Sequence, residues 1–108
     1  MKTIQYHKLV RDRIPEIIEA QGKTCKVSTL SDEDYLKMID AKLDEELAEY
    51  HADQNIEELA DLMEVIYAAV KARGYSAEDL EKVRTQKVEK RGAFEKKVLL
   101  EEVMELEN

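Results

Sequence analysis

Residues 44–70 read DEELAEYHADQNIEELADLMEVIYAAV, and this stretch decides the fold. Apolar residues recur at helical spacing on both sides of Asp53, Gln54 and Asn55, which are typical of a short turn. Asn55 is a favourable N-cap for the helix that follows. Because a short turn makes the flanking helices antiparallel neighbours, the stretch predicts a helical hairpin.

Helical signals extend this hairpin outward in both directions. Ser31, with Asp34 three residues later, is typical of an N-cap. It predicts a first long helix that continues to residue 50 or 52. The second long helix is predicted over residues 56–72, and Gly74 ends it.

A third long helix and a short one complete the set. Ser76 is predicted to open the third, which stops near Gly92. Near the N-terminus, Pro15 suits the first turn of a short helix, where its missing N–H is not needed. That helix is predicted to run toward Gln21 and to stop at Gly22.

Two further segments have strand-like composition. Residues 24–30, TCKVSTL, are rich in β-branched residues that roughly alternate, which predicts a short strand. Residues 96–103, KKVLLEEV, are predicted to form a second strand or a last helical turn. No repeat or Ser/Gly linker interrupts the chain. We therefore expect one domain over residues 1–108, an all-α bundle of three long helices with a short N-terminal helix.

Bulk composition limits the function. The formal net charge of −8 argues against a general binder of nucleic acid polymers, because phosphate neutralisation supplies most of such affinity. A single cysteine, Cys25, cannot form an internal disulfide. The sequence contains no apolar run of about 20 residues and no signal-peptide core. We therefore expect a cytoplasmic protein that does not bind a membrane. A domain this small predicts that a second subunit completes any site.

Acidic residues on the apolar face of the first long helix are the clearest functional signal. At about 100° per residue, Glu46 falls inside an apolar arc of roughly 80°. Glu49 and Lys42 lie at its edge, and Glu45 lies further round. A carboxylate in a packing face is unfavourable unless it is paired or bound to a metal. The apolar arc consists of Leu36, Ile39, Leu43, Leu47 and Tyr50.

The second long helix repeats this pattern. Glu58 points into one flank of the apolar face and Asp61 lies beside it, whereas Glu57 and Glu64 occupy the polar side. In an antiparallel hairpin the four carboxylates Glu46, Glu49, Glu58 and Asp61 converge and require a cation. Oxygen ligands without a Cys or His cluster favour Mg²⁺, with Mn²⁺ as a substitute. The apolar face consists of Ile56, Leu59, Leu62, Met63, Ile66, Tyr67 and Val70.

Chance spacing is the alternative, since the chain has 25 Asp and Glu residues. For Glu45, Glu57 and Glu64 a solvent-facing position is the better interpretation. The facing argument favours a functional interpretation for Glu46 and Glu58.

Basic residues provide the complementary signal. In the third long helix Arg84, Lys87 and Arg91 share one face, and Lys90 lies on its flank. They either form salt bridges directly with the acids or meet them through a bound phosphate and Mg²⁺. A second group near the N-terminus, Lys8, Arg11 and Arg13, is as consistent with a solvated surface as with a phosphate clamp.

Two hexapeptides in the hairpin have a recognisable pattern. EELAEY at 45–50 and EELADL at 57–62 resemble the ExxE…ExxD signature of the all-α NTP pyrophosphohydrolases. That superfamily includes MazG, the dimeric dUTPases and phosphoribosyl-ATP pyrophosphohydrolase. Residues 6–23 and 87–103 are similar to a MazG-like subgroup labelled phosphoribosyl-ATP pyrophosphohydrolase-like. The resemblance spans nearly the whole chain.

The resemblance implies a helical bundle that assembles into a homodimer or homotetramer. It also implies Mg²⁺-dependent cleavage of a nucleotide substrate between the α and β phosphates, which yields a nucleoside monophosphate and pyrophosphate. By position, Glu46 and Glu49 match the first acidic pair of the signature, and Glu58 and Asp61 match the second. Only eight residues separate Glu49 from Glu58, a shorter link than in many MazG proteins.

The charges suggest a division of roles. Glu49, or the outer Glu45, is the candidate that orients and deprotonates the attacking water. Lys87, Lys90 and Arg91 are candidates for binding the pyrophosphate, with Lys8 and Arg11 as further ones. Two alternatives remain open at this point: a true phosphoribosyl-ATP pyrophosphohydrolase of histidine synthesis, and a non-catalytic acidic helical module that binds basic surfaces.

Overall fold

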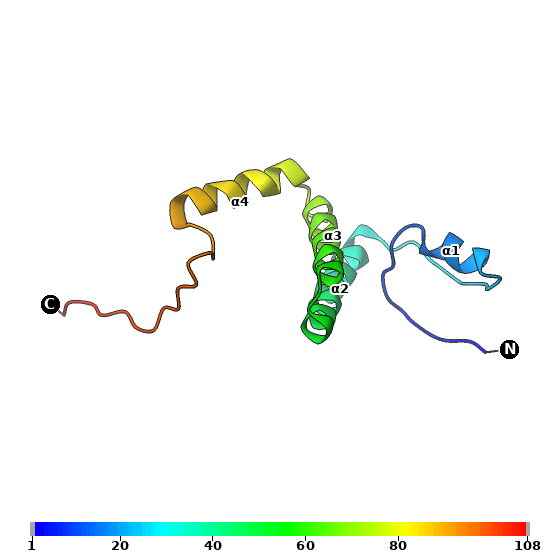
Figure 1. The fold of residues 1–108 in the computed structure, drawn as a ribbon. Coiled ribbons are helices and arrows are strands. Elements are labelled where there is room, and N and C mark those ends of the chain that lie inside the picture. Colours follow the sequence, from blue (N-terminus) through cyan, green and yellow to red (C-terminus); the bar gives the residue numbers. More distant parts are fainter. Residues whose placement is uncertain (1, 108) are drawn as a thin grey trace. The chain divides into compact units, whose positions relative to one another are not determined.

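The computed structural model describes residues 2–107, and every regular element in this part of the chain is a helix (Figure 1). The all-α prediction is therefore confirmed. The chain divides into two units, Met1–Ala77 and Glu78–Asn108. The expectation of one domain stays a prediction. The helices are α1 (Ile14–Ala20), α2 (Asp32–Asp53), α3 (Ile56–Ala72) and α4 (Ala77–Arg91).

The predicted N-caps of the two longest helices are present. Ser31 Oγ accepts a hydrogen bond of 3.2 Å from the backbone N–H of Asp34. Asn55 Oδ1 accepts one of 2.9 Å from the N–H of Glu58. Each cap satisfies a donor that the helix itself leaves unpaired and is worth about 1 kcal/mol. These two caps fix where α2 and α3 begin.

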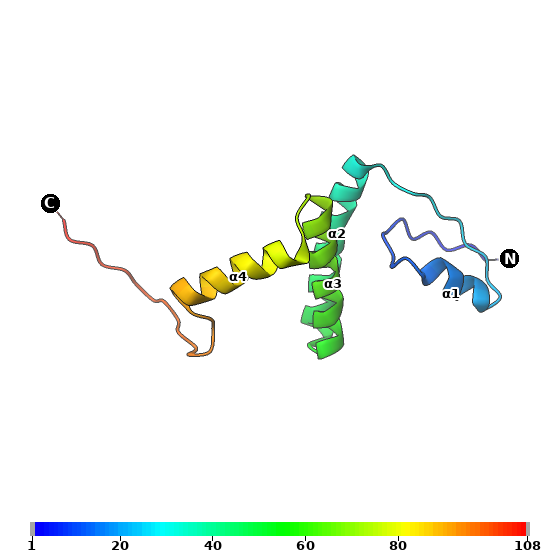
Figure 2. The same cartoon turned by 90° about the horizontal axis from the view of Figure 1, so that it is seen from above.

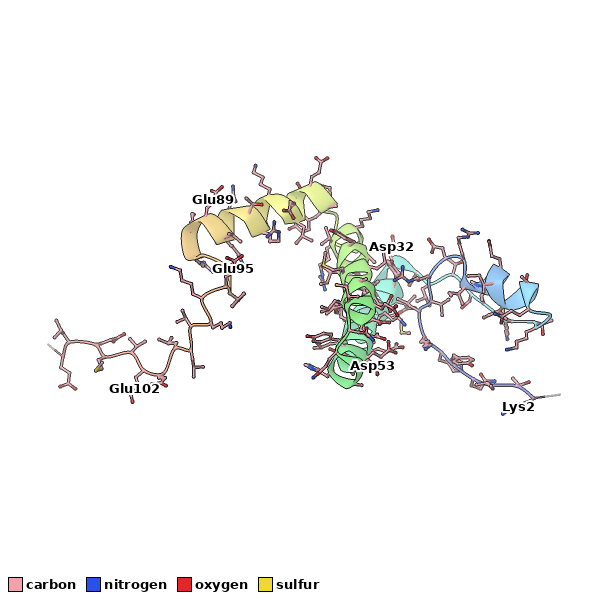
Figure 3. The ribbon with its side chains drawn as sticks, in the orientation of Figure 1. Lys2, Asp32, Asp53, Glu89, Glu95 and Glu102 are labelled. Carbon is pink, nitrogen blue, oxygen red and sulfur yellow. The ribbon has the colours of Figure 1, made fainter. Side chains whose placement is uncertain are left out.

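Helices α2 and α3 form the predicted hairpin and lie side by side in both views (Figures 1 and 2). Asp32 and Asp53 mark the two ends of α2 (Figure 3). The chain reverses at Gln54, whose φ of 52° is left-handed and whose N–H donates to the carbonyl of Tyr50 at 2.7 Å. The last turns of α2 therefore lie beside the first turns of α3.

The hairpin has a thin core. Among residues 2–107, only Ile39 and Glu46 are buried, with 3% and 7% of their surface exposed. Leu47, Leu59 and Met63 remain 43%, 39% and 45% exposed. Two helices share a single interface, so the outward part of each apolar face has no packing partner among the described residues of the first unit. The first unit thus presents an apolar surface on this hairpin.

The N-terminal arm, defined here as residues 2–13, is irregular and leads into α1. Pro15 lies in the first turn of α1, as predicted. After the helix, Gly22 adopts a φ of 81° and its N–H donates to the carbonyl of Glu19 at 3.0 Å. A left-handed residue of this kind ends helices readily when it is glycine. The predicted stop at Gly22 is confirmed.

The predicted strands are wrong. Neither residues 24–30 nor residues 96–103 form a strand, and no helix includes either segment. Within the described chain no backbone hydrogen bond joins either segment to a neighbouring strand. β-branched composition favours a strand only where a partner and a packing face exist, and neither segment has them. Val27 and Val98 are accordingly 64% and 83% exposed.

The second unit consists of most of α4 and an irregular segment. Helix α4 ends at Arg91 and is followed by Gly92, whose φ is 81° and whose N–H donates to the carbonyl of Val88 at 2.8 Å. Its end is therefore as predicted, while the packing of three long helices into one bundle stays a prediction. No helix within residues 2–107 has both the length and the apolar content to span a bilayer. The segment after α4 exposes Phe94, Val98, Leu99, Leu100, Val103, Met104 and Leu106.

Candidate metal centre

Five carboxylates gather where the end of α2 meets the start of α3. Oxygens of Glu46, Glu58 and Asp61 lie within 4.8 Å of one another, and so do oxygens of Glu45, Glu46 and Glu49. Glu46 belongs to both groups. We call these five residues the acidic cluster. All four predicted metal ligands are members, and so is Glu45.

The hairpin itself positions these side chains. Glu46 and Glu49 are three residues apart and so project from one side of α2 within its last two turns. Glu58 and Asp61 have the same spacing in the first two turns of α3, just after the Asn55 cap. The short turn places these helix ends together. The cluster is thus a product of two helix faces and one turn.

Two oxygens in the cluster lack hydrogen-bond partners. Glu46 is 7% exposed, and both Glu46 Oε2 and Glu58 Oε2 are enclosed with no hydrogen bond from the described residues. Enclosed carboxylate oxygens are normally hydrogen-bonded, because a hydrogen bond from the protein replaces those that the oxygen loses when water is excluded. These two oxygens come from different helices. They mark a place where a proton or a cation is favoured.

The pKa values of these two acids shift in the same direction. Burial raises the pKa of Glu46, and the neighbouring Glu49 raises it further, with only partial opposition from Lys42. Desolvation also raises the pKa of Glu58, and the negative charges of Glu49, Asp53, Asp61 and Glu46 raise it further. Both carboxylates therefore release their protons less readily than free glutamates do.

Three basic residues contact the cluster. Lys42 Nζ lies 3.3 Å from Oε1 of Glu45 and 3.3 Å from Oε1 of Glu46. Two more come from the N-terminal arm: Lys8 Nζ is 3.3 Å from Glu45 Oε1, and Arg11 Nη2 is 2.6 Å from Asp61 Oδ1.

These contacts correct the interpretation of Glu45 as a solvent-facing acid. Glu45 is half-buried between two lysines. Desolvation opposes its ionisation, but Lys42 and Lys8 outweigh it and lower its pKa. The pKa of Lys42 is raised: burial alone lowers it, and the hydrogen bonds to Glu45 and Glu46 outweigh burial.

A divalent cation fits the charge and the donors. Five carboxylates face three basic side chains, so the acidic groups outnumber the basic ones by two. All donors are oxygens, which Mg²⁺ and Mn²⁺ prefer. Oxygens on opposite sides of Mg²⁺ are about 4.2 Å apart, close to the span of each group. Small side-chain movements would bring either group to bonding distance.

The predicted phosphate-binding residues of α4 belong to the second unit. Lys87, Lys90 and Arg91 are exposed there, and their predicted role in binding pyrophosphate stays a prediction. Arg84, which shares their face, donates from Nε to Glu81 Oε2 at 3.0 Å within the same helix.

Sequence reasoning missed a groove at the other end of the hairpin. It measures about 470 Å³ and lies between the first turn of α2 and the last turns of α3. Tyr67, interpreted from the sequence as part of the apolar face, is half-buried and also lines this groove. The available signal was the pair of small residues Ala68 and Ala72, one turn apart. The lining consists of Asp32, Tyr35, Glu64, Tyr67, Ala68, Lys71 and Ala72.

Comparison with known proteins gives one partial relative. No protein-family model matches the chain, and no solved structure matches it. A protein of Mycolicibacterium smegmatis (strain ATCC 700084 / mc(2)155), described only as an uncharacterized protein, is 60% identical over 45 residues. The match covers 42% of this chain and 46% of the relative, so this chain matches about half of that protein's length. The family therefore stays a prediction from the motifs.

Proposed function

We propose that this protein is a cytoplasmic, Mg²⁺-dependent nucleotide pyrophosphohydrolase that cleaves the α–β phosphoanhydride and releases pyrophosphate. One observation carries the proposal: two enclosed, unpartnered carboxylate oxygens belong to Glu46 and Glu58, members of the same acidic cluster on different helices. A solvated acidic surface has no need of such oxygens. The ExxE…ExxD spacing supports the same reading.

In this proposal Glu46, Glu49, Glu58 and Asp61 hold the cation. A bound Mg²⁺ supplies positive charge to the phosphates and acidifies a water molecule. Glu45 is a weak candidate for the general base, because Lys42 and Lys8 outweigh desolvation and lower its pKa. This leaves Glu49 as the candidate, through a carboxylate oxygen that the cation does not occupy. Glu45 then anchors Lys42 rather than taking the proton.

The groove offers a place for the rest of the nucleotide. Ala68 lies two turns beyond Asp61 on the same side of α3, a separation of about 10 Å. A nucleoside attached to phosphates at the acidic cluster spans a distance of this size. Tyr35 and Tyr67 line the groove and provide aromatic surface for a base.

A non-catalytic interaction module is the second candidate. The ion pairs of Lys8, Lys42 and Arg11 favour it, because they compensate most of the cluster without a metal. The exposed apolar residues after α4 also favour a binding role. A phosphoribosyl-ATP pyrophosphohydrolase would share the acidic cluster and differ only in its substrate.

Pyrophosphate release from a substrate panel tests the proposal. The panel contains standard and modified nucleoside triphosphates and phosphoribosyl-ATP, each with Mg²⁺ and with EDTA. We expect Mg²⁺-dependent release with one favoured substrate, which also separates the two enzyme candidates. If no member of the panel releases pyrophosphate, and Mg²⁺ does not change the melting temperature of the protein, the interaction module would be established instead.

The exposed apolar residues of the hairpin support a homodimer or homotetramer. Replacement of both Leu59 and Met63 by Gln is expected to weaken self-association at least tenfold, since burial of each large apolar side chain contributes about 1.5–3 kcal/mol. Sedimentation velocity over a concentration series measures the effect. Val27→Gln, in the loop before α2, is the control and should leave association unchanged. Equal association of both variants would place the interface elsewhere.

A further inference from the structure

The N-terminal arm contacts both helices of the hairpin through charged side chains. Lys8 pairs with Glu45 on α2, and Arg11 pairs with Asp61 on α3. Beside the Lys8 contact the arm leaves space against α2. A small hollow of about 160 Å³ separates it from α2, lined by His7, Lys8, Leu9, Met38, Ala41, Lys42 and Glu45. The arm is therefore attached to the acidic cluster by charge more than by burial.

Arg11 and a metal ion require the same carboxylate. Arg11 Nη2 lies 2.6 Å from Asp61 Oδ1, and Asp61 also supplies an oxygen to the group formed with Glu46 and Glu58. A guanidinium and a divalent cation at one carboxylate repel each other. Both partners are substantially solvent-exposed, 57% for Arg11 and 41% for Asp61, so the ion pair is weakly held. A cation that binds several carboxylates at once displaces it.

We propose that the N-terminal arm is a latch on the acidic cluster. Lys8 and Arg11 neutralise Glu45 and Asp61 while no divalent cation is bound. Glu45 belongs to one of the two carboxylate groups and Asp61 to the other, so cations held by these groups compete with both basic residues and release them. The release places two basic side chains next to the cluster, where they are available to phosphate oxygens. This last step rests on the proposed function; the competition between the arm and the cation does not.

Mn²⁺ binding to the full chain without nucleotide tests the competition. In a titration followed by electron paramagnetic resonance, Arg11→Gln is expected to bind Mn²⁺ about two- to fivefold more tightly than wild type, the range that an exposed ion pair is worth. Arg13→Gln is the matched control, because Arg13 pairs with Glu16 at the start of α1 and not with the hairpin. Unchanged or weaker Mn²⁺ binding by Arg11→Gln would overturn the latch.

Trypsin cleavage reports release of the arm directly. Mn²⁺ is expected to accelerate cleavage after Lys8 and Arg11 severalfold, measured by mass spectrometry and normalised to cleavage after Lys23. Lys23 follows α1 and is exposed, so it corrects for any effect of Mn²⁺ on the protease. Cleavage after Lys8 and Arg11 that is unchanged or slower would show that the arm stays in place, and the latch would be wrong.

Turnover separates this inference from the proposed function. With Mg²⁺ and the favoured nucleotide, Arg11→Gln is expected to raise KM about tenfold through the lost phosphate contact, while Arg13→Gln leaves KM unchanged. Tighter Mn²⁺ binding by Arg11→Gln without pyrophosphate release from any nucleotide would retain the latch and discard the enzyme. Pyrophosphate release without tighter Mn²⁺ binding by Arg11→Gln would retain the enzyme and reject the latch. If neither wild type nor Arg11→Gln binds Mn²⁺, both proposals fall.

Discussion

Replacement of Glu46 by Gln is expected to lower Mg²⁺-dependent pyrophosphate release about a thousandfold without lowering the melting temperature of the metal-free protein. Glu46 belongs to both carboxylate groups of the cluster, so its loss removes a ligand from each. A metal contributes several kcal/mol of transition-state stabilisation, and about 4 kcal/mol corresponds to this factor. Steady-state assays and thermal denaturation in EDTA measure the two effects.

The stability half of this prediction follows from the pKa of Glu46. Burial raises that pKa, so the ionised carboxylate is disfavoured in the folded metal-free protein. The neutral amide of Gln removes this unfavourable charge while keeping the shape. Glu57→Gln is the matched control on the exposed side of α3 and should leave both turnover and stability unchanged. Near-normal turnover in Glu46→Gln would refute the site, and loss of folding would assign Glu46 a structural role.

Mg²⁺ at about one hundred times its Kd is expected to raise the free energy of unfolding by about 2.7 kcal/mol, because the folded state alone presents the cluster. For a domain of this size that increase raises the melting temperature by about ten degrees. EDTA should reverse the shift, and Glu58→Gln should abolish most of it. Differential scanning calorimetry measures the shift, and an equal shift in Glu58→Gln would exclude Glu58 as a ligand.

The Mg²⁺ effect should also grow with pH. Folded Glu46 and Glu58 have raised pKa values, so between 4.5 and those values the folded state binds more protons than the unfolded state. Their contribution to metal-free stability is therefore full below pH 4.5 and declines as the pH rises through the raised values. Metal binding requires both carboxylates ionised, so stabilisation by Mg²⁺ increases over the same window. An Mg²⁺-induced rise in melting temperature that is equal at pH 5 and pH 7.5 would contradict this dependence.

Glu45 has the opposite dependence in a different window. Its pKa is lowered, so its contribution to stability is present above 4.5 and is lost as the pH falls through the lower folded value. The two effects occupy different sides of pH 4.5. They can therefore be separated in a single pH series of melting temperatures recorded in EDTA.

Local signals in the sequence predicted the helices well. The caps at Ser31 and Asn55 and the stops at Gly22 and Gly92 each involve residues within one or two turns of one another. Helical periodicity likewise assigns Glu46 to the packing face, and the structure buries it. Interactions of this range are set by the chain itself, so pattern and propensity suffice.

The sequence pattern did not predict which residues pair between segments far apart in the chain. The ion pairs Lys8–Glu45 and Arg11–Asp61 join residues 37 and 50 positions apart, and no periodicity relates their positions. The strand prediction over residues 24–30 failed for a related reason, because β-branched composition says nothing about whether a partner strand exists. The groove depends on how two helix ends pack against each other, so the sequence pattern does not predict it either.

The short separation along the chain of the five cluster carboxylates has a kinetic consequence. All of them fall within residues 45–61, on two helices joined by one turn. Contacts between residues close in sequence form fast, because little loop-closure entropy opposes them. The cation-binding carboxylates therefore assemble as soon as this helical pair nucleates. The N-terminal arm is synthesised first, but its ion pairs with the hairpin form only when much larger loops close. In a folding chain the carboxylates can therefore bind a metal before Lys8 and Arg11 pair with them.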